Sequence, residues 1–233
     1  MNYEDLKKNS ELIGIDISED MITMLKKYYE LLSLWNEKIN LTAITEEEEV
    51  IEKHFFDCIK PLEELEIEGK VVDVGSGAGF PGLVFKIIRP NYDMVLLEPN
   101  NKRVTFLKEV IKELDLKNIE VINERSEDFA KENREKYDIV CARAVANLNI
   151  LSELCLPLVK ENGIFLAMKG AKANEELLEA KEAISKLGGE LKKQQEYELP
   201  TGGSRTNLFY KKIKKTPDKY PRNYSQIKKK PLK

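Results

Sequence analysis

The sequence predicts an α/β fold in which a mostly parallel, seven-stranded sheet carries helices on both faces. From about residue 70, apolar strand-like segments alternate with helical segments, which is the pattern of βαβ units. The valine-rich segment 71–74 is followed at once by four glycines within eight residues, as in the strand–loop–helix units that bind nucleotides. We expect an N-terminal helical extension at residues 1–66, the α/β core at 67–216 and a basic C-terminal tail at 217–233.

The first sixty residues are predicted to be helical. Ser18 is a suitable N-cap, and six apolar residues follow it at alternating spacings of four and three, which places them in one stripe. The stripe consists of Met21, Leu25, Tyr28, Leu32, Trp35 and Ile39. A capping box at Thr45 and Glu48 predicts a second helix that runs through Ile59 and ends at Pro61.

Strands and helices then alternate through the predicted core. The expected strands are 71–74, 94–97, 119–122, 137–141, 164–168, 190–199 and 207–213, and the expected helices are 102–114, 148–159 and 173–187, with another beginning near Pro81. The last two strands flank Pro200-Thr201-Gly202-Gly203, so we expect them to pair as a hairpin. After Thr216-Pro217 the periodicity is lost, which predicts an irregular tail docked on the core.

The register of the glycine loop indicates which nucleotide it holds. Gly77-x-Gly79-x-x-Gly82 fits the dinucleotide fingerprint, but Gly75 is the first glycine after the strand, and Asp73 precedes it by two residues. A carboxylate there suits a cationic or amine-bearing ligand better than a pyrophosphate. The pattern Val-Asp-Val-Gly-x-Gly-x-Gly resembles the first motif of the class I S-adenosylmethionine-dependent methyltransferases, which have a Rossmann-like fold. That resemblance implies S-adenosylmethionine as the cofactor.

Polar residues also follow the other strands, at the sheet edge where ligands bind. Glu98 ends the second strand, where a carboxylate can accept hydrogen bonds from two ribose hydroxyls in either class of cofactor. Ser126 and Glu127 follow the third strand and could read an adenine amino group, or could simply cap a short helix. Arg143 follows the fourth strand, beside the expected position of a transferred methyl group.

Charge is distributed unevenly along the chain. Residues 205–233 contain eleven Lys or Arg against one acid and carry +10; since the whole chain carries −3, residues 1–204 carry −13. A basic end on an acidic body suggests contact with a polyanion, although a solvated tail would look the same. Aromatic residues and an arginine interleave with these lysines, as stacking on exposed bases would require: Tyr210, Tyr220, Tyr224 and Arg222. Truncation after Thr216 is therefore expected to weaken RNA binding and to leave cofactor affinity nearly unchanged.

Composition also limits the class of protein to which the chain can belong. No segment approaches the roughly 18 apolar residues of a membrane span. The N-terminus lacks the basic and apolar regions of a signal peptide. Three widely spaced cysteines with neither CxxC spacing nor histidine neighbours predict ordinary thiols in a reducing compartment and no zinc site: Cys58, Cys141 and Cys155. We expect a cytoplasmic monomer that binds no metal.

The residues after the fourth predicted strand bear on the chemistry. They contain neither the Asp/Asn-Pro-Pro-Tyr/Phe motif typical of adenine amino methylation nor the cysteine motif of pyrimidine carbon methylation. A target that is already nucleophilic at neutral pH fits better, and guanine N7 has an in-plane lone pair and no proton. Such a reaction needs proximity and in-line orientation, so we predict no catalytic general base.

Several segments together resemble one family. Residues 73–82 are similar to the loop of the bacterial small-subunit ribosomal RNA guanine-N7 methyltransferases, the RsmG or GidB family. The other similar segments, in the family's order, are Trp35-Asn36-x-x-Ile39-Asn40-Leu41-Thr42, His54-Phe55-Phe56-Asp57-Cys58, Lys102-Arg103-x-x-Phe106-Leu107, Arg143-Ala144, Lys169-Gly170 and Tyr220-Pro221-Arg222. The likeness covers nearly the whole chain. Cys58 departs from it, because a small serine is expected there.

The resemblance implies methylation of N7 of a guanine in the 530-loop of 16S ribosomal RNA, free or in a small-subunit particle. The expected cofactor-binding residues are Asp73, Gly75, Gly77, Phe80, Glu98, Ser126, Glu127 and Arg143. The RNA-side candidates are Asn40, His54, Lys169, Arg205 and Arg222, with Arg143 at the border, and each could instead be structural. Three alternatives stay open: a small-molecule methyltransferase of the same fold, a non-catalytic RNA-binding module and a nicotinamide-dependent oxidoreductase.

Overall fold

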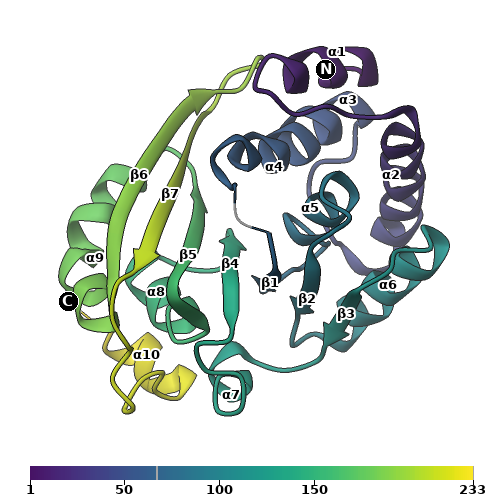
Figure 1. Ribbon diagram of the computed structural model, residues 1–233. Coiled ribbons are helices and arrows are strands. Elements are labelled where there is room, and N and C mark those ends of the chain that lie inside the picture. Colours follow the sequence, from purple (N-terminus) through teal and green to yellow (C-terminus); the bar gives the residue numbers. More distant parts are fainter. Residues whose placement is uncertain (67, 233) are drawn as a thin grey trace.

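A seven-stranded sheet forms the centre of the molecule, as predicted (Figure 1). The computed structural model describes residues 1–66 and 68–232, so the predicted boundary at residue 67 and the tail's last residue, 233, lie outside the described residues. The strands are β1 (Lys70–Val74), β2 (Asp93–Leu97), β3 (Ile119–Ile122), β4 (Tyr137–Arg143), β5 (Val159–Lys169), β6 (Gly189–Glu198) and β7 (Ser204–Lys212). Their order is β3-β2-β1-β4-β5-β7-β6; β7 runs antiparallel to both β5 and β6, and the other neighbouring strands pair in parallel.

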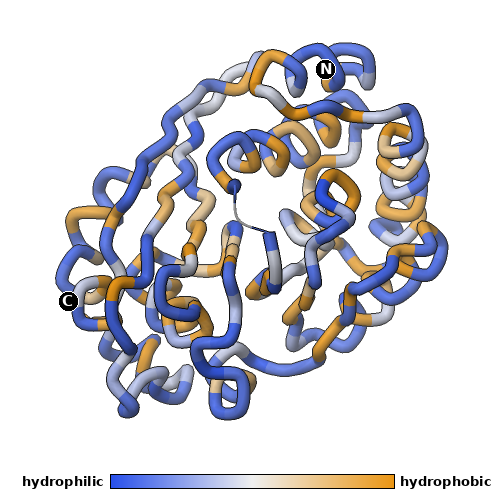
Figure 2. Tube along the Cα trace, viewed as in Figure 1, coloured by the Kyte–Doolittle hydropathy of each residue, from blue (hydrophilic) through white to orange (hydrophobic). Residues whose placement is uncertain are grey.

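Helices cover both faces of this sheet. They are α1 (Tyr3–Glu11), α2 (Glu19–Ile39), α3 (Glu47–Val50), α4 (Asp57–Ile59), α5 (Gly82–Ile88), α6 (Asn101–Glu113), α7 (Ser126–Phe129), α8 (Leu148–Cys155), α9 (Ala173–Leu187) and α10 (Tyr224–Lys229). Neighbouring strand residues point to opposite faces, so Val71 joins a core with α2, α5 and α6, whereas Val72 joins a core with α8 and α9. Figure 2 shows apolar segments both in the strands and in the helices around them.

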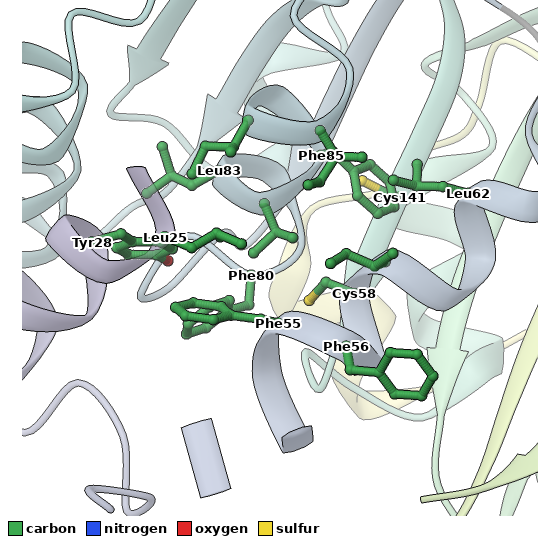
Figure 3. Packing of buried hydrophobic residues seen from close by; sticks show 14 of the residues in the cluster. Leu25, Tyr28, Phe55, Phe56, Cys58, Leu62, Phe80, Leu83, Phe85 and Cys141 are labelled. Carbon is green, nitrogen blue, oxygen red and sulfur yellow. The ribbon is translucent and has the colours of Figure 1, made fainter. Parts of the chain in front are cut away.

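The first long helix forms as the sequence predicts. The Ser18 hydroxyl accepts a hydrogen bond from the Met21 N–H at 3.2 Å and caps α2. Leu25 and Tyr28 of its apolar stripe are fully buried. Figure 3 shows them facing Phe55 and Phe80, so the stripe attaches the N-terminal helices to the glycine loop.

The second predicted helix is interrupted and differently capped. Its N-cap is Glu46, which makes no side-chain capping bond, so the capping box predicted at Thr45 and Glu48 is wrong. After α3 the chain forms a π-helix, η1 (Ile51–Phe56), then α4 and a 3₁₀ segment, η2 (Lys60–Glu64). Pro61 lies inside the first turn of η2 instead of ending the helix, because a first turn does not use the N–H that proline lacks.

Two predictions in the second half also need correction. Helix α8 ends at Cys155 and β5 begins at Val159, because Pro157 lies between them and proline disrupts a helix interior. The tail is not wholly irregular, since Asn223 caps the short helix α10. The predicted β6–β7 hairpin is confirmed. Among residues 1–66 and 68–232, no helix combines the length and apolar character that a bilayer crossing requires.

Candidate active site

The glycine loop between β1 and α5 is fixed by backbone hydrogen bonds. The N–H groups of Gly75 and Ser76 both donate to the Leu97 carbonyl at the end of β2, at 2.8 and 3.2 Å. Gly75 has a φ of +72°, and a Cβ added there would lie 2.9 Å from a methyl carbon of Val145. Both observations require glycine at this position, because an L side chain would be strained and would fill the space in front of the strand.

The two carboxylates predicted beside this loop hold its backbone. Asp73 Oδ2 accepts from the Gly82 N–H at 3.0 Å, and burial raises the pKa of the Asp73 carboxyl to about 7. Glu98 accepts from the N–H groups of Gly77 and Asn100, both at 2.8 Å. Asp73 is fully buried and Glu98 is only 2% exposed. Both buried carboxylates therefore hold the loop in its conformation through hydrogen bonds to its backbone.

A pocket of about 160 Å³ lies in front of the loop, at the ends of β1, β2 and β3; we call it the β1–β3 pocket. It is lined by Val74, Gly75, Leu97, Pro99, Glu124, Arg125, Ser126, Glu127, Val145, Leu154 and Tyr224. Three of the predicted cofactor residues thus share one cavity: Gly75, Ser126 and Glu127. The Ser126 hydroxyl donates to the Leu154 carbonyl at 2.6 Å, which ties α7 to α8 at the pocket's edge.

A larger pocket of about 520 Å³ lies at the ends of β4 and β5; we call it the β4–β5 pocket. Four of the predicted residues line it: His54, Arg143, Lys169 and Arg205. The remaining lining residues are Ile44, Lys53, Asp57, Ala144, Val145, Ala146, Met168, Gly170, Glu176 and Asn207. Four cationic side chains against two carboxylates give this pocket a positive balance.

Asp57 organises one wall of the β4–β5 pocket. Its Oδ2 accepts from Arg143 Nη1 at 3.1 Å, and its Oδ1 lies 3.2 Å from Arg205 Nε. Its Oδ1 also accepts from the Tyr197 hydroxyl at 2.8 Å. The carboxylate is nearly buried, so it orients both guanidinium groups toward the cavity while neutralising part of their charge.

His54 is held neutral beside Arg143. Burial, followed by the nearby Arg143 charge, lowers the pKa of His54 to about 3. Arg143 Nη2 lies 3.1 Å from Nδ1 of the imidazole, and Thr42 Oγ1 lies 2.9 Å from its Nε2. Nδ1 also lies 3.0 Å from the Lys53 carbonyl oxygen, so both ring nitrogens have polar partners within the protein. Phe80 packs on both groups, with ring centres 4.5 Å apart for His54 and Arg143 Cζ 4.9 Å from the Phe80 centre.

The loop after β4 separates the two pockets. Lys169 Nζ donates to the Ala146 carbonyl at 2.7 Å, and Glu176 accepts from the Leu148 N–H at 2.7 Å and pairs with Lys169 at 2.6 Å. Val145, directly before the first of these anchors, lines both pockets. The two cavities therefore meet at one side chain, directly in front of Gly75.

Other predicted residues lie elsewhere. Asn40 ends α2 in an exposed left-handed conformation and lines neither pocket. Arg222 pairs with the buried Glu153 at 2.6 Å. Tyr210 and Tyr220 are only 2% and 9% exposed, so the predicted stacking of these two rings on bases is wrong; β7 is an inner strand and the tail folds back on the core. Phe80, Asp73, Gly77 and Glu98 support the loop without lining either pocket.

Sequence reasoning missed several pocket residues. Val145, Glu176 and Asn207 belonged to no motif, and Tyr224 was singled out only as a candidate for stacking on bases. Asp57 stood inside the segment 54–58, which was singled out for its resemblance alone. Its role depends on two arginines 86 and 148 residues further along the chain, and no local spacing encodes that pairing.

Comparisons with known proteins agree on one family. Residues 21–202 match the family model described as GidB, rRNA small subunit methyltransferase G. A relative from Clostridium perfringens (strain SM101 / Type A) named ribosomal RNA small subunit methyltransferase G is 49% identical, with all of both chains covered. The protein of that name from Bacillus subtilis is 45% identical, with 100% of this chain and 99% of the relative covered.

A solved structure shares the fold. A mutant of the 16S rRNA (adenine(1408)-N(1))-methyltransferase from Catenulisporales acidiphilia, solved with cosubstrate SAM, superposes with a TM-score of 0.53 at 12% identity. The superposition covers 68% of this chain and 91% of that one. This likeness supports the predicted class I methyltransferase architecture.

Proposed function

The chain belongs to the rRNA small subunit methyltransferase G family, and from that premise we propose that it methylates N7 of a guanine in the 530-loop of 16S ribosomal RNA with S-adenosylmethionine as donor. The observation that carries this proposal is the shared wall at Val145, which lines both the β1–β3 and the β4–β5 pockets. A donor in one pocket and an acceptor base in the other would meet in front of Gly75.

The β1–β3 pocket fits one part of the cofactor. Its volume of about 160 Å³ is below the roughly 300 Å³ of a small-molecule site, so it suits the adenine end, with the rest of the cofactor along the glycine loop. The loop leaves room for the rest of the cofactor, because Gly75 has no side chain and a Cβ at this position would fill the space in front of the loop. Ser126 and Glu127 would frame the adenine. When bound, S-adenosylmethionine supplies a methyl group carried by a positively charged sulfur.

The eight predicted cofactor residues then divide into two groups. Gly75, Ser126 and Glu127 would touch the cofactor directly, as lining residues of its pocket. Asp73, Gly77, Phe80 and Glu98 would act through the loop, because the two carboxylates bond its backbone and Phe80 packs beneath it. Arg143 would stand at the border, on the side of the substrate base.

The β4–β5 pocket fits the substrate base. Guanine presents O6 as an acceptor beside N7, and Arg143, Lys169 and Arg205 bring donors that could hold O6 while the N7 lone pair stays free for the methyl group. The positive balance of the lining also suits the phosphates on either side of a flipped-out nucleotide. Reading of an extruded base is the usual way in which enzymes reach a ring nitrogen.

No general base is needed for this transfer, which agrees with the state of His54. With a pKa of about 3, and with both ring nitrogens engaged by Arg143 and Thr42, His54 is a poor proton acceptor in this site. Guanine N7 has no proton to lose, so the residues around the pocket contribute orientation and the exclusion of water.

The remaining expectations form part of the same proposal. The chain acts as a cytoplasmic monomer on ribosomal RNA, free or in a small-subunit particle, without a metal. Residues 1–66 extend a methyltransferase core at 67–216, and the basic tail at 217–233 follows it. Among residues 1–66 and 68–232, no cluster of three or more His, Cys, Asp or Glu side chains is placed to hold a metal ion.

The decisive experiment is methyl transfer in vitro. Small-subunit particles and purified 16S RNA from a strain lacking the modification are incubated with labelled S-adenosylmethionine, and the labelled nucleotide is mapped. Label at N7 of a 530-loop guanine is expected, and Gly75→Asp should abolish it. Label in small solutes alone would indicate a small-molecule methyltransferase, and RNA binding without transfer would indicate a binding module. Binding of NAD but not of S-adenosylhomocysteine would favour an oxidoreductase.

The assignment of the base pocket is tested separately. Arg205→Ala should lower RNA methylation at least tenfold while S-adenosylhomocysteine affinity stays within twofold, because Arg205 lines only the β4–β5 pocket. Lys192→Ala is the matched control, since Lys192 is an exposed cation outside both pockets. Equal activity of the Arg205 variant and the control would show that the base does not bind in this pocket.

A further inference from the structure

One wall of the β1–β3 pocket comes from the far end of the chain. Most of its lining residues belong to the sheet edge or to the segments that follow β1, β2, β3 and β4, and Leu154 belongs to α8. Tyr224 is the exception, since it begins α10 in the basic tail. The charge pattern of this segment predicted a role in RNA binding, so its place beside the glycine loop is a new observation.

The Tyr224 ring is held against the pocket by its neighbours. The Arg125 guanidinium carbon lies 5.3 Å from the centre of the Tyr224 ring, within the range of a cation–π contact. Arg125 precedes Ser126, and both residues line the same pocket. Tyr224 also packs as a partly buried side chain against the apolar core on the α8 side of the sheet. These two contacts fix the position of the ring at the edge of the pocket.

An ion pair two residues earlier anchors the segment. Arg222 donates to Glu153 from its backbone N–H at 3.0 Å, from Nε at 2.8 Å and from Nη2 at 2.6 Å, and Glu153 is fully buried in α8. The next residue, Leu154, lines the pocket, and its carbonyl accepts the bond from Ser126. Glu153, which anchors the tail, and Leu154, which lines the pocket, are thus consecutive residues of α8.

We propose that Tyr224 closes the adenine end of the cofactor pocket and that the C-terminal segment is a working part of the cofactor site. The inference rests on the proposed function, which assigns this pocket to the adenine of S-adenosylmethionine. A flat aromatic ring at the pocket's rim offers a purine an apolar contact face and shields it from water. The C-terminal segment then contributes to cofactor affinity. The sequence, by contrast, predicts that truncation after Thr216 leaves this affinity nearly unchanged.

Point variants of the full chain test this role. The dissociation constant of S-adenosylhomocysteine is measured by calorimetry for the unmodified chain, Tyr224→Ala, Tyr224→Phe and Lys228→Ala. Tyr224→Ala should bind at least fivefold more weakly, because the aromatic wall is lost, and Tyr224→Phe should stay within twofold because the ring remains. Lys228 is the matched control, since it is an exposed residue of the same helix that does not line the pocket.

A second measurement avoids any variant that fails to fold. Hydrogen exchange of the unmodified chain is compared with and without saturating S-adenosylhomocysteine. Amides of residues 222–229 should exchange more slowly when the ligand is bound, whereas those of α9, which contributes nothing to the pocket, should not change. Affinity of Tyr224→Ala within twofold of the unmodified chain, or unchanged exchange in 222–229, would overturn the inference. If the unmodified chain binds no S-adenosylhomocysteine, the proposed function itself fails.

Discussion

The buried carboxyl of Asp73 makes the stability of this protein depend on pH in a defined direction. Burial raises the pKa of Asp73 from 3.8 to about 7 in the folded chain, while the Gly82 N–H hydrogen bond opposes that shift. The folded state therefore holds the proton over a range in which the unfolded chain has lost it. The resulting stabilisation is complete below pH 3.8 and disappears as the pH rises through about 7.

The magnitude follows from the size of the shift. Each pKa unit corresponds to about 1.4 kcal/mol, so the full effect is roughly 4 kcal/mol. Between pH 5 and pH 8.5, about two of these units are traversed, and the free energy of unfolding should fall by roughly 3 kcal/mol from this group alone. Asp73→Asn keeps an oxygen that can accept from Gly82 and does not titrate, so the variant should lack this part of the decline.

Urea denaturation from pH 5 to 8.5 at constant ionic strength measures the effect as the difference between the unmodified chain and Asp73→Asn. That difference isolates the one group, because the other titrations are common to both proteins. Asp16→Asn, which removes an exposed carboxylate, is the matched control and should follow the unmodified chain. A difference between the Asp73 pair that stays constant with pH, or that changes in the opposite direction, would refute the reasoning.

Three further predictions concern the loop, the tail anchor and the thiols. Gly75→Ala should weaken S-adenosylhomocysteine binding at least tenfold by calorimetry, about 1.4 kcal/mol, because the new Cβ would lie 2.9 Å from Val145. Gly170→Ala is the control and should bind this ligand normally, because a Cβ at Gly170 would meet open space. Arg222→Ala should lower the free energy of unfolding by about 3 kcal/mol in urea, since it leaves the buried Glu153 carboxylate without a cationic partner, and a loss below about 1 kcal/mol would contradict this. A thiol reagent should titrate no cysteine until the chain unfolds, because burial raises each thiol pKa; a fast-reacting thiol in the folded chain would be the contrary result. The cysteines concerned are Cys58, Cys141 and Cys155.

Local features of the fold could be predicted because their causes are local. The valines of β1 and the glycines that follow them set a strand and a turn within twelve residues, and Ser18 caps α2 through a bond that spans three residues. Where tertiary contacts compete, the same rules failed. The predicted capping box at Thr45 gave way to an uncapped start at Glu46, and the unbroken helix became α, π and 3₁₀ pieces packed against the core.

The sequence by itself determined the strand–helix alternation, the glycine loop and the carboxylates near it, because these depend on spacing and on the conformational freedom of single residues. Only the tertiary structure decided that Asp73 is buried behind the loop, that Asp57 joins Arg143 to Arg205, and that Tyr224 reaches the pocket in front of β1. The chain holds 41 acidic and 38 basic residues, so charge alone leaves too many possible partners for any one carboxylate. Packing of the sheet and its helices selects among them, because it fixes which distant side chains share a cavity and which are withdrawn from water.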